Sequence, residues 1–525
     1  MLRLIVVCSF FIFLISNTIK AQHPNPSLIL YIIIDEVNNQ QLQILQPKFT
    51  KEGFNLISKQ GMRFMSAYSS DISGYPGTRL TSFYTGTTPS VHGIVGEQWY
   101  DKKINHYVEA TTNDYTNIDY TLNYNQAKSI SDYLKSFYGR QVRSAAISIN
   151  APWMLHTLGY SPDYFFSFNN HNGTFINHLT SQESSELWLE RFNNNLKRSK
   201  LLQRQWGPLN DITSYTEYQH LKNEDKKKFR PFLYNMAATN TETFERLAAS
   251  PYANTLVRDL AVSFITSNDF GKKNTPDILS LVFTARPFKS NGSILPAEKE
   301  DMLLRIDRDI ASLISFLDNE IGSKEYLVIV TSAASSPPDH SSSGKTGVTT
   351  GIVEFKKTSA LLNLYLMAIH GQGKWVLGMH DNYVYLNHKL ILEKELKINE
   401  IQKEASRFLM DVAGIDRAIP TFNLILDINT DPTLSNNIYP SRTADIILSL
   451  QSGWQSAVTK AGTRQTSLSG KSPMPLILRG WKITPGAWIE PFNHQYITPL
   501  LLKQLGILHP AILNAPLIPI FNSEL

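Results

Sequence analysis

Along most of the chain, short apolar runs of strand length alternate with stretches in which apolar residues recur at helical spacing. Residues 28–34, LILYIII, form a continuous apolar run rich in β-branched residues, which predicts a strand buried on both faces that ends at Asp35. Further strands are predicted at 142–149, 277–283, 326–331 and 475–480, and helices at 51–60, 126–137, 298–321 and 498–505. This alternation predicts a parallel sheet covered by helices.

The section from about 150 to 250 breaks this pattern, because it is rich in Asn, Ser, Tyr and Trp and has weak periodicity. We interpret it as an inserted cap region, with aromatic residues that pack it against the sheet. Residues 335–350, SSPPDHSSSGKTGVTT, have the composition of a loop. Without an internal repeat or a clear linker, the simplest organisation is one domain over 22–525 that contains the cap.

The N-terminus predicts a cleavable signal peptide over residues 1–21. Arg3 precedes an apolar run over 4–15, and a polar stretch then leads to Ala21. A membrane anchor would need a longer apolar run of ~20 residues. Cys8 follows Val7, where a lipoprotein signal has a small residue, so a lipoprotein is not expected. The mature chain would lack cysteine and transmembrane segments, and would be periplasmic or secreted.

Composition and charge limit the classes of partner. The 525 residues are 42% hydrophobic and 18% charged, which is enough to bury a large core. The formal charge of +5 falls to about +3 without the signal peptide, which carries two of the 50 basic residues, Arg3 and Lys20, set against 45 acidic ones. The charge is small and no basic block stands out, so no nucleic-acid partner is expected.

Several segments carry a resemblance to a known family. In chain order, and over nearly the whole mature chain, they are the strand ending at Asp35, YTGTTPSVHGIVGEQWYD (84–101), ISINAPWMLHTLG (147–159), SPYANTLVRDLAVSFI (250–265), the strand at 277–283, LLRIDRDIASLISFLD (303–318), KWVLGMHDNYVYLN (374–387) and the strand at 475–480. They resemble the bacterial PafA-type alkaline phosphatases, which are similar to type I phosphodiesterases/nucleotide pyrophosphatases. The resemblance implies an α/β/α sandwich with a central, mostly parallel sheet, a threonine nucleophile and two zinc ions.

The residues that this family uses for chemistry are largely missing. Asp35 matches the first metal-binding aspartate, but the position of the nucleophile holds Pro76, which has no hydroxyl. Thr78 and Thr81 would each need a shift in register to replace it. The other ligand positions hold Pro287, Asn291, Ala333 and Ala334, and the last expected histidine falls near Arg464. A zinc site normally needs three or four protein ligands, so bound zinc is not expected and Asp35 fits a structural role.

The phosphate-binding positions implied by the resemblance are also altered. They hold Glu97, Asn150 and Pro152 where the family has Asn, Lys and Arg. A carboxylate repels an anion, and neither Asn150 nor Pro152 supplies a charge-assisted hydrogen bond. His92 fits a structural role in the HGI turn.

The sequence therefore favours an exported, catalytically inactive pseudoenzyme that acts as a binding or assembly component with a protein or cell-envelope partner. One alternative is a divergent phosphate- or sulfate-ester hydrolase with a rebuilt site made of Asp35, Thr78, Asp339 and His340. Such a site would place ligands on a loop, which disfavours preorganisation. A second alternative is a carbohydrate- or peptide-binding module that uses cap aromatics.

Overall fold

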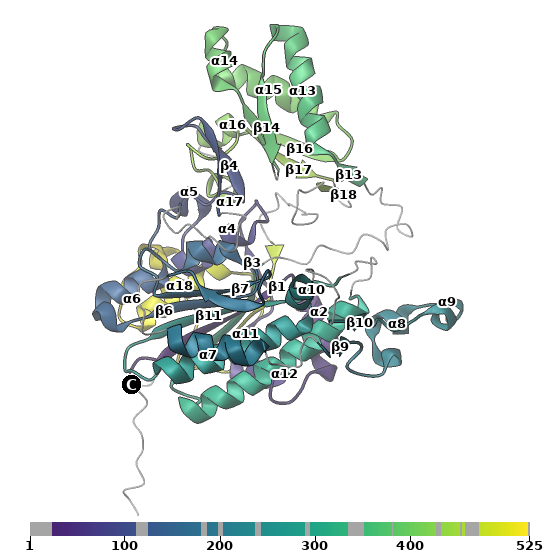
Figure 1. Cartoon of the computed structure of the whole chain (residues 1–525). Helices are drawn as coiled ribbons and strands as arrows, with labels where there is room; N and C mark the ends of the chain where they lie inside the picture. Colours follow the sequence, from purple (N-terminus) through teal and green to yellow (C-terminus); the bar gives the residue numbers. More distant parts are fainter. Residues whose placement is uncertain are drawn as a thin grey trace, which may run out of the picture.

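The computed structural model describes residues 24–111, 124–179, 186–197, 203–236, 243–288, 295–333, 351–380, 382–426, 432–451, 454–456 and 472–522. A nine-stranded sheet lies at its centre (Figure 1). The strands, in spatial order, are β21 (Gly486–Trp488), β2 (Gly61–Phe64), β20 (Leu476–Gly480), β12 (Tyr326–Ser332), β1 (Leu28–Asp35), β11 (Asp277–Thr284), β6 (Ser144–Ser148), β7 (Tyr164–Asn169) and β8 (Thr174–Asn177).

Strand β1 is the central strand and pairs in parallel with β11 on one side and β12 on the other. Strands β6 and β7 continue the parallel pairing, whereas β20 and β8 run antiparallel to their neighbours. The predicted mostly parallel sheet is therefore confirmed. Because parallel strands end at the same edge, the carboxyl ends of β1, β11 and β12 lie side by side.

Helices cover both faces of the sheet, as predicted (Figure 1). Ile29, Tyr31 and Ile33 of β1 belong to one hydrophobic core, and the residues that alternate with them belong to the other. The first core includes α4 (Pro76–Thr85), α6 (Ile130–Tyr138) and α18 (Ile497–Gln504). The second includes α3 (Phe54–Gln60), α7 (Glu186–Lys197), α11 (Pro251–Asn268) and α12 (Ala297–Glu320).

The range predicted as a cap, about 150–250, is more integrated than a cap would be. Its strands β7 and β8 extend the central sheet, and aromatic side chains such as Phe165 and Phe166 alternate between the two cores. A section within 203–236 projects from the side of the sheet (Figure 1), and it contains the paired strands β9 (Gln205–Trp206) and β10 (Tyr234–Asn235) with the short helices α8 (Thr216–His220) and α9 (Asn223–Lys228). The sequence of β7, YFFSFN, shows no apolar–polar alternation because side chains on both faces of this strand are buried.

A second sheet with its own core lies between residues 351 and 456, at the top of Figure 1. Its antiparallel strands are β14 (Val376–His380), β15 (Tyr383–Leu386), β17 (Ile446–Leu450) and β16 (Ile415–Pro420), in that order. Helices α13 (Phe355–His370), α14 (His388–Glu393) and α15 (Ile398–Met410) pack on it. Arg442 links this unit to the main body, because its guanidinium lies over the ring of Trp99 at 5.1 Å and its Nη1 donates to the carbonyl oxygen of Gly93 at 2.7 Å.

Among the described residues, no helix combines the length and the apolar character needed to cross a membrane. The predicted loop over 335–350 lies outside the described residues.

Candidate functional site

Asp35 lies at the carboxyl edge of the central sheet. It is the last residue of β1, in register with Thr284 of β11, while Ile34 is in register with Ser332 of β12. The residues that follow these strands therefore meet at one edge, and they include Ala333 and Pro287.

Two protein cations lie at the carboxylates of Asp35 and Glu36, and we call these residues with Arg286 and Lys299 the carboxylate–cation cluster. Nη2 of Arg286 lies 2.7 Å from Oε1 of Glu36 and 3.4 Å from Oδ2 of Asp35. The buried Lys299 donates to the backbone carbonyl oxygen of Glu36. Each carboxylate therefore already has a positive partner from the protein itself.

Burial lowers the pKa of Lys299 to about 8, and the neighbouring carboxylates of Glu36 and Asp35 oppose that shift. Lys299 therefore carries a positive charge at neutral pH. Glu36 has a backbone φ of 59°, in the left-handed region, and the hydrogen bond from Lys299 to its carbonyl stabilises this turn.

The ligand chemistry at this edge does not fit a zinc ion. Ala333 is fully buried and has no donor atom, and Pro287 offers no side-chain ligand either. Within the described ranges, no group of three or more His, Cys, Asp or Glu side chains is arranged to hold a metal. Asn291, Ala334, Asp339, His340 and Arg464 lie outside the described residues, so the proposed rebuilt site with Asp339 and His340 stays untested.

Helix α4 contains Pro76, where the resemblance predicts the nucleophile position, together with Thr78 and Thr81. Pro76 is its first residue, where a missing N–H is tolerated, and Gly86 ends the helix in the left-handed conformation. The hydroxyl of Thr81 donates to the carbonyl oxygen of Gly77 at 2.6 Å. Thr78 is fully buried, and its hydroxyl has no hydrogen-bond partner among the described residues. Among the described residues, no base forms a hydrogen bond with either hydroxyl, and a nucleophile would need one.

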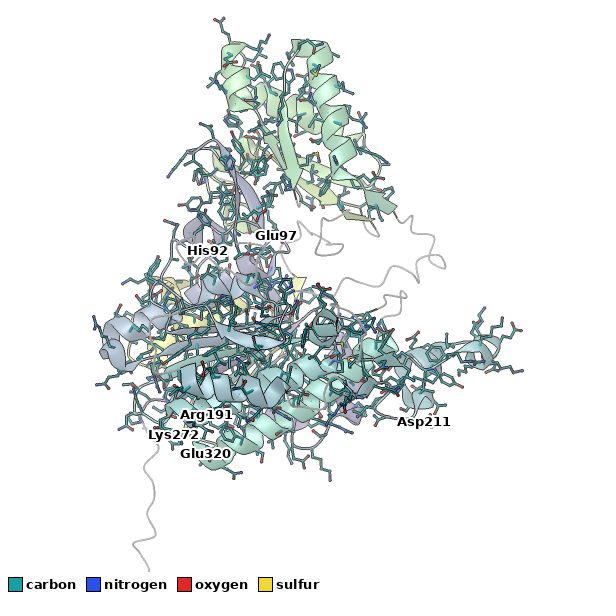
Figure 2. All side chains as sticks on the ribbon, in the orientation of Figure 1. His92, Glu97, Arg191, Asp211, Lys272 and Glu320 are labelled. Atoms are coloured by element: carbon teal, nitrogen blue, oxygen red, sulfur yellow. The ribbon has the colours of Figure 1, made fainter. Side chains whose placement is uncertain are left out.

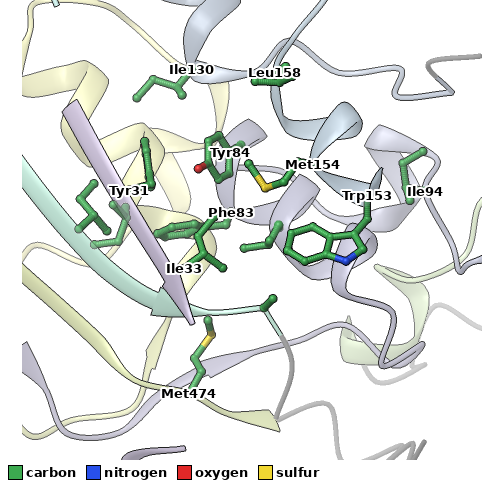
Figure 3. Packing of buried hydrophobic residues seen from close by; sticks show 14 of the residues in the cluster. Tyr31, Ile33, Phe83, Tyr84, Ile94, Ile130, Trp153, Met154, Leu158 and Met474 are labelled. Carbon is green, nitrogen blue, oxygen red and sulfur yellow. The ribbon is translucent and has the colours of Figure 1, made fainter. Parts of the chain in front are cut away.

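Phe83 and Tyr84, on the same helix, pack against Tyr31 of β1 (Figure 3). The ring of Tyr84 lies 4.4 Å from that of Tyr31, and its hydroxyl is 2.6 Å from Ser280 Oγ. The segment is therefore fixed to the sheet by aromatic packing.

A buried ion pair stands beside the same helix. Nε of Arg79 lies 3.2 Å from Oδ2 of Asp71, and the two side chains are 2% and 0% exposed. Asp71 also accepts a hydrogen bond from Ser69 Oγ at 2.5 Å. His494 is fully buried nearby and stacks on Phe83, with ring centroids 5.1 Å apart. Burial, and secondarily the charge of Arg79, lower the pKa of His494 to about 3, so it is neutral.

Ser82 and His92 form a contact that superficially resembles a nucleophile and its base, with 2.9 Å between Ser82 Oγ and His92 Nε2. The backbone N–H of Ile94 donates to Nδ1 of His92, so this nitrogen carries no proton. Burial, then electrostatic interactions with the neighbouring His156 and Arg442, hold the pKa of His92 well below its usual value. The neutral ring therefore carries its proton on Nε2 and donates to Ser82, which excludes His92 as the base for that serine.

The three predicted phosphate-side positions offer no cation. Glu97 is half-buried between α5 (Pro89–His92) and β4 (Gln98–Asp101), and its backbone carbonyl accepts from the N–H of Ala110 (Figure 2). Asn150 is exposed, and Pro152 is buried at the start of the short helix η4 (Pro152–Thr157). A phosphate placed here would meet no charged donor from these residues.

Sequence reasoning missed Arg286, Lys299 and Asp71. Arg286 was detectable, since it follows the strand that pairs with β1 and should reach the same edge as Asp35. Lys299 lies in the first turn of α12 among acidic residues, a pattern typical of a solvated helix start, so it carried no signal. Asp71 and Arg79 are eight residues apart, and only the fold brings them together.

Comparison with known proteins identifies the family of this chain. A model described as type I phosphodiesterase / nucleotide pyrophosphatase matches residues 75–474. The chain is 24% identical over 516 residues to alkaline phosphatase PafA of Elizabethkingia meningoseptica, with 93% of each chain covered. It is 21% identical to alkaline phosphatase PhoV of Synechococcus elongatus, covering 93% of this chain and 91% of that one.

Solved structures show the same fold. The crystal structure of wild-type PafA superposes with a TM-score of 0.79 at 22% identity, covering 92% of this chain and 96% of that one. Murine ectonucleotide pyrophosphatase/phosphodiesterase 5 gives a TM-score of 0.51 at 12% identity, covering 94% and 97%. These comparisons confirm the predicted α/β/α architecture and the resemblance to PafA-type proteins.

Proposed function

The chain belongs to the type I phosphodiesterase/nucleotide pyrophosphatase family, and from that premise we propose that it is an exported, catalytically inactive member that acts as a binding or assembly component. The carboxylate–cation cluster carries this proposal. Asp35, the one retained metal ligand, faces the guanidinium of Arg286, whose Nη2 also lies 2.7 Å from Glu36.

Electrostatics explain why this arrangement opposes a metal. A zinc ion at Asp35 would stand close to two positive side chains, Arg286 and Lys299, and would have to displace the first of them. The neighbouring strand ends supply Ala333 and Pro287, which cannot add ligands. One carboxylate shared with a guanidinium cannot hold a metal that needs three or four protein ligands.

The nucleophile position supports the same proposal. Pro76 starts α4 and has no hydroxyl, and the nearby Thr78 is buried without an activating group among the described residues. The strands, helices and aromatic packing around α4 form a buried core, which supports a structural or binding role for this framework. The predicted signal peptide over 1–21 places that framework in the periplasm or outside the cell in this proposal, with a protein or another cell-envelope component as the partner.

Hydrolysis assays test the proposal directly. Purified residues 22–525 are incubated with p-nitrophenyl phosphate and bis-p-nitrophenyl phosphate, with and without added zinc, beside the matched variant Asp35→Ala. We expect both proteins to release p-nitrophenol no faster than buffer. Turnover in the wild-type protein that disappears in Asp35→Ala would show a working metal site and would overturn the proposal.

A further inference from the structure

A pocket of about 250 Å³ lies where α2 (Asn39–Leu45), the short helix η1 (Gln46–Lys48) and α3 face strands β2 and β20. It has an apolar part and a polar part. Its lining residues are Asn39, Leu42, Gln43, Gln46, Phe49, Phe54, Asn55, Ser58, Arg63, Phe64, Met65, Leu476 and Ile477. We call it the Arg63 pocket. It contains one cation and no acidic side chain.

Two side-chain amides hold the walls of the Arg63 pocket in place through hydrogen bonds to backbone carbonyls. Nδ2 of Asn39 donates to the carbonyl oxygens of Met65 and Met474, at 3.3 and 3.2 Å. Nδ2 of Asn55 donates to those of Gln46 and Phe49, at 3.2 and 3.1 Å. These two amides tie the helices to the strand ends and to each other, so the pocket is preformed.

The apolar part consists of aromatic rings. Phe49 and Phe54 are buried, and their ring centroids lie 4.8 Å apart. Ile477 of β20 pairs with Arg63 of β2 and belongs to the same hydrophobic core as the two rings. An aromatic or aliphatic ligand body would bury apolar surface against them.

Arg63 supplies the charge. Met62 and Phe64 belong to the core on the other face of the sheet, so Arg63 points toward α3 and the pocket. Its Nε is buried and has no hydrogen-bond partner among the described residues. A buried N–H without a partner is unfavourable, and a guanidinium satisfies that group best with a planar carboxylate that accepts two parallel hydrogen bonds.

We propose that the Arg63 pocket binds a small organic monocarboxylate, with its carboxylate on Arg63 and an aromatic or aliphatic body against Phe49 and Phe54. A monoanion fits better than a phosphate dianion, because the pocket offers a single cation beside neutral amides and one hydroxyl. The binding does not depend on any phosphatase chemistry, and it goes beyond the function proposed above.

Phenylacetate is the probe for this site, and phenylacetamide is its neutral counterpart. Calorimetry and ligand-observed NMR on purified residues 22–525 should give saturable binding of phenylacetate at least tenfold tighter than that of phenylacetamide. Arg63→Gln should weaken phenylacetate at least tenfold. Arg140→Gln, which removes an exposed arginine elsewhere, should leave it unchanged.

A second variant keeps the test decisive if Arg63→Gln does not fold by circular dichroism. Ser58→Phe places a ring in the pocket and should abolish binding of both probes. Absence of saturable binding to the wild-type protein would overturn the site. Equal affinity for the acid and the amide would overturn the role of Arg63, and binding that survives Ser58→Phe would overturn the location.

Discussion

The buried pair of Asp71 and Arg79 gives the sharpest prediction about the stability of the segment around α4. Both side chains are almost fully buried, and Nε of Arg79 lies 3.2 Å from Oδ2 of Asp71. Arg79→Met removes the cation and leaves a buried carboxylate, a change that typically costs about 3–5 kcal/mol of unfolding free energy. Ser69 Oγ and the N–H of Gly74 still donate to Asp71 in the variant, so we expect about 3 kcal/mol, at the lower end.

The double variant Arg79→Met with Asp71→Leu separates a buried charge from a packing defect. Because it removes both charges, it should lose much less than the sum of the two single variants. Urea unfolding followed by tryptophan fluorescence and far-UV circular dichroism measures these differences. Arg140→Met, at an exposed position, serves as the control and should stay within about 0.5 kcal/mol of the wild type. A loss below about 1 kcal/mol in Arg79→Met, or strict additivity in the double variant, would refute the reasoning.

Three further predictions concern other charged or titratable side chains of the candidate site. His494 stays neutral in the fold with a pKa of about 3, whereas in the unfolded chain it takes up a proton near its ordinary value, so stability falls as the pH drops from about 6.5 toward 3. His494→Phe removes this pH dependence. As the pH falls from 7 to 6 and 5, the unfolding free energy of the variant should rise relative to that of the wild type by up to about 1.4 kcal/mol per pH unit, as measured by urea unfolding. Parallel pH curves for the two proteins would contradict this prediction. Lys299 has a pKa of about 8 in the folded protein, below its value in the unfolded chain. As the pH rises from about 8 to about 10.5, the folded state loses this proton before the unfolded state does, so the unfolding free energy of the wild type should rise relative to that of Lys299→Met. A difference between those two proteins that is flat across this window would be inconsistent with a buried Lys299. Arg286 is half-exposed, with a side chain 51% accessible, so Arg286→Ala should change the unfolding free energy by less than about 1 kcal/mol, and a larger loss in thermal or urea unfolding would show that this pair is structural.

The central sheet was predictable because its signal is local. The run LILYIII is buried on both faces, and a strand of that kind needs neighbours and helices on each side, which β11, β12 and the two helix layers provide. The helices predicted at 51–60, 126–137 and 298–321 appear as α3, α6 and α12 with ends shifted by up to four residues.

The second sheet was not predictable in the same way. Residues 383–384 pair with 446–447, about 60 positions away, and no local pattern specifies that partner. An amphipathic helix pattern does not tell whether a helix such as α13 or α15 packs on the main sheet or on another one. Strand β7 shows no apolar–polar alternation because both of its faces are buried, so the sequence pattern predicts a cap there.

At the candidate site, the sequence identifies which positions lack ligand or nucleophile side chains, whereas the structure is needed to find the partners of the carboxylates. Pro76, Pro287 and Ala333 exclude side-chain ligands or nucleophiles by their chemistry alone, so these positions could be interpreted without coordinates. Lys299 could not, because it reaches the carbonyl oxygen of Glu36 from α12, and a long cationic side chain at a helix start is usually solvated. The carboxylate–cation cluster is therefore a product of tertiary structure.

Zinc stoichiometry is the most direct measurement of the central claim. Purified residues 22–525 and the variant Asp35→Ala are dialysed against buffered zinc, passed over a desalting column and analysed for metal by mass spectrometry. The proposed inactive role predicts far less than one zinc per chain, with no difference between the two proteins. One or two zinc ions per wild-type chain that are lost in Asp35→Ala would contradict it.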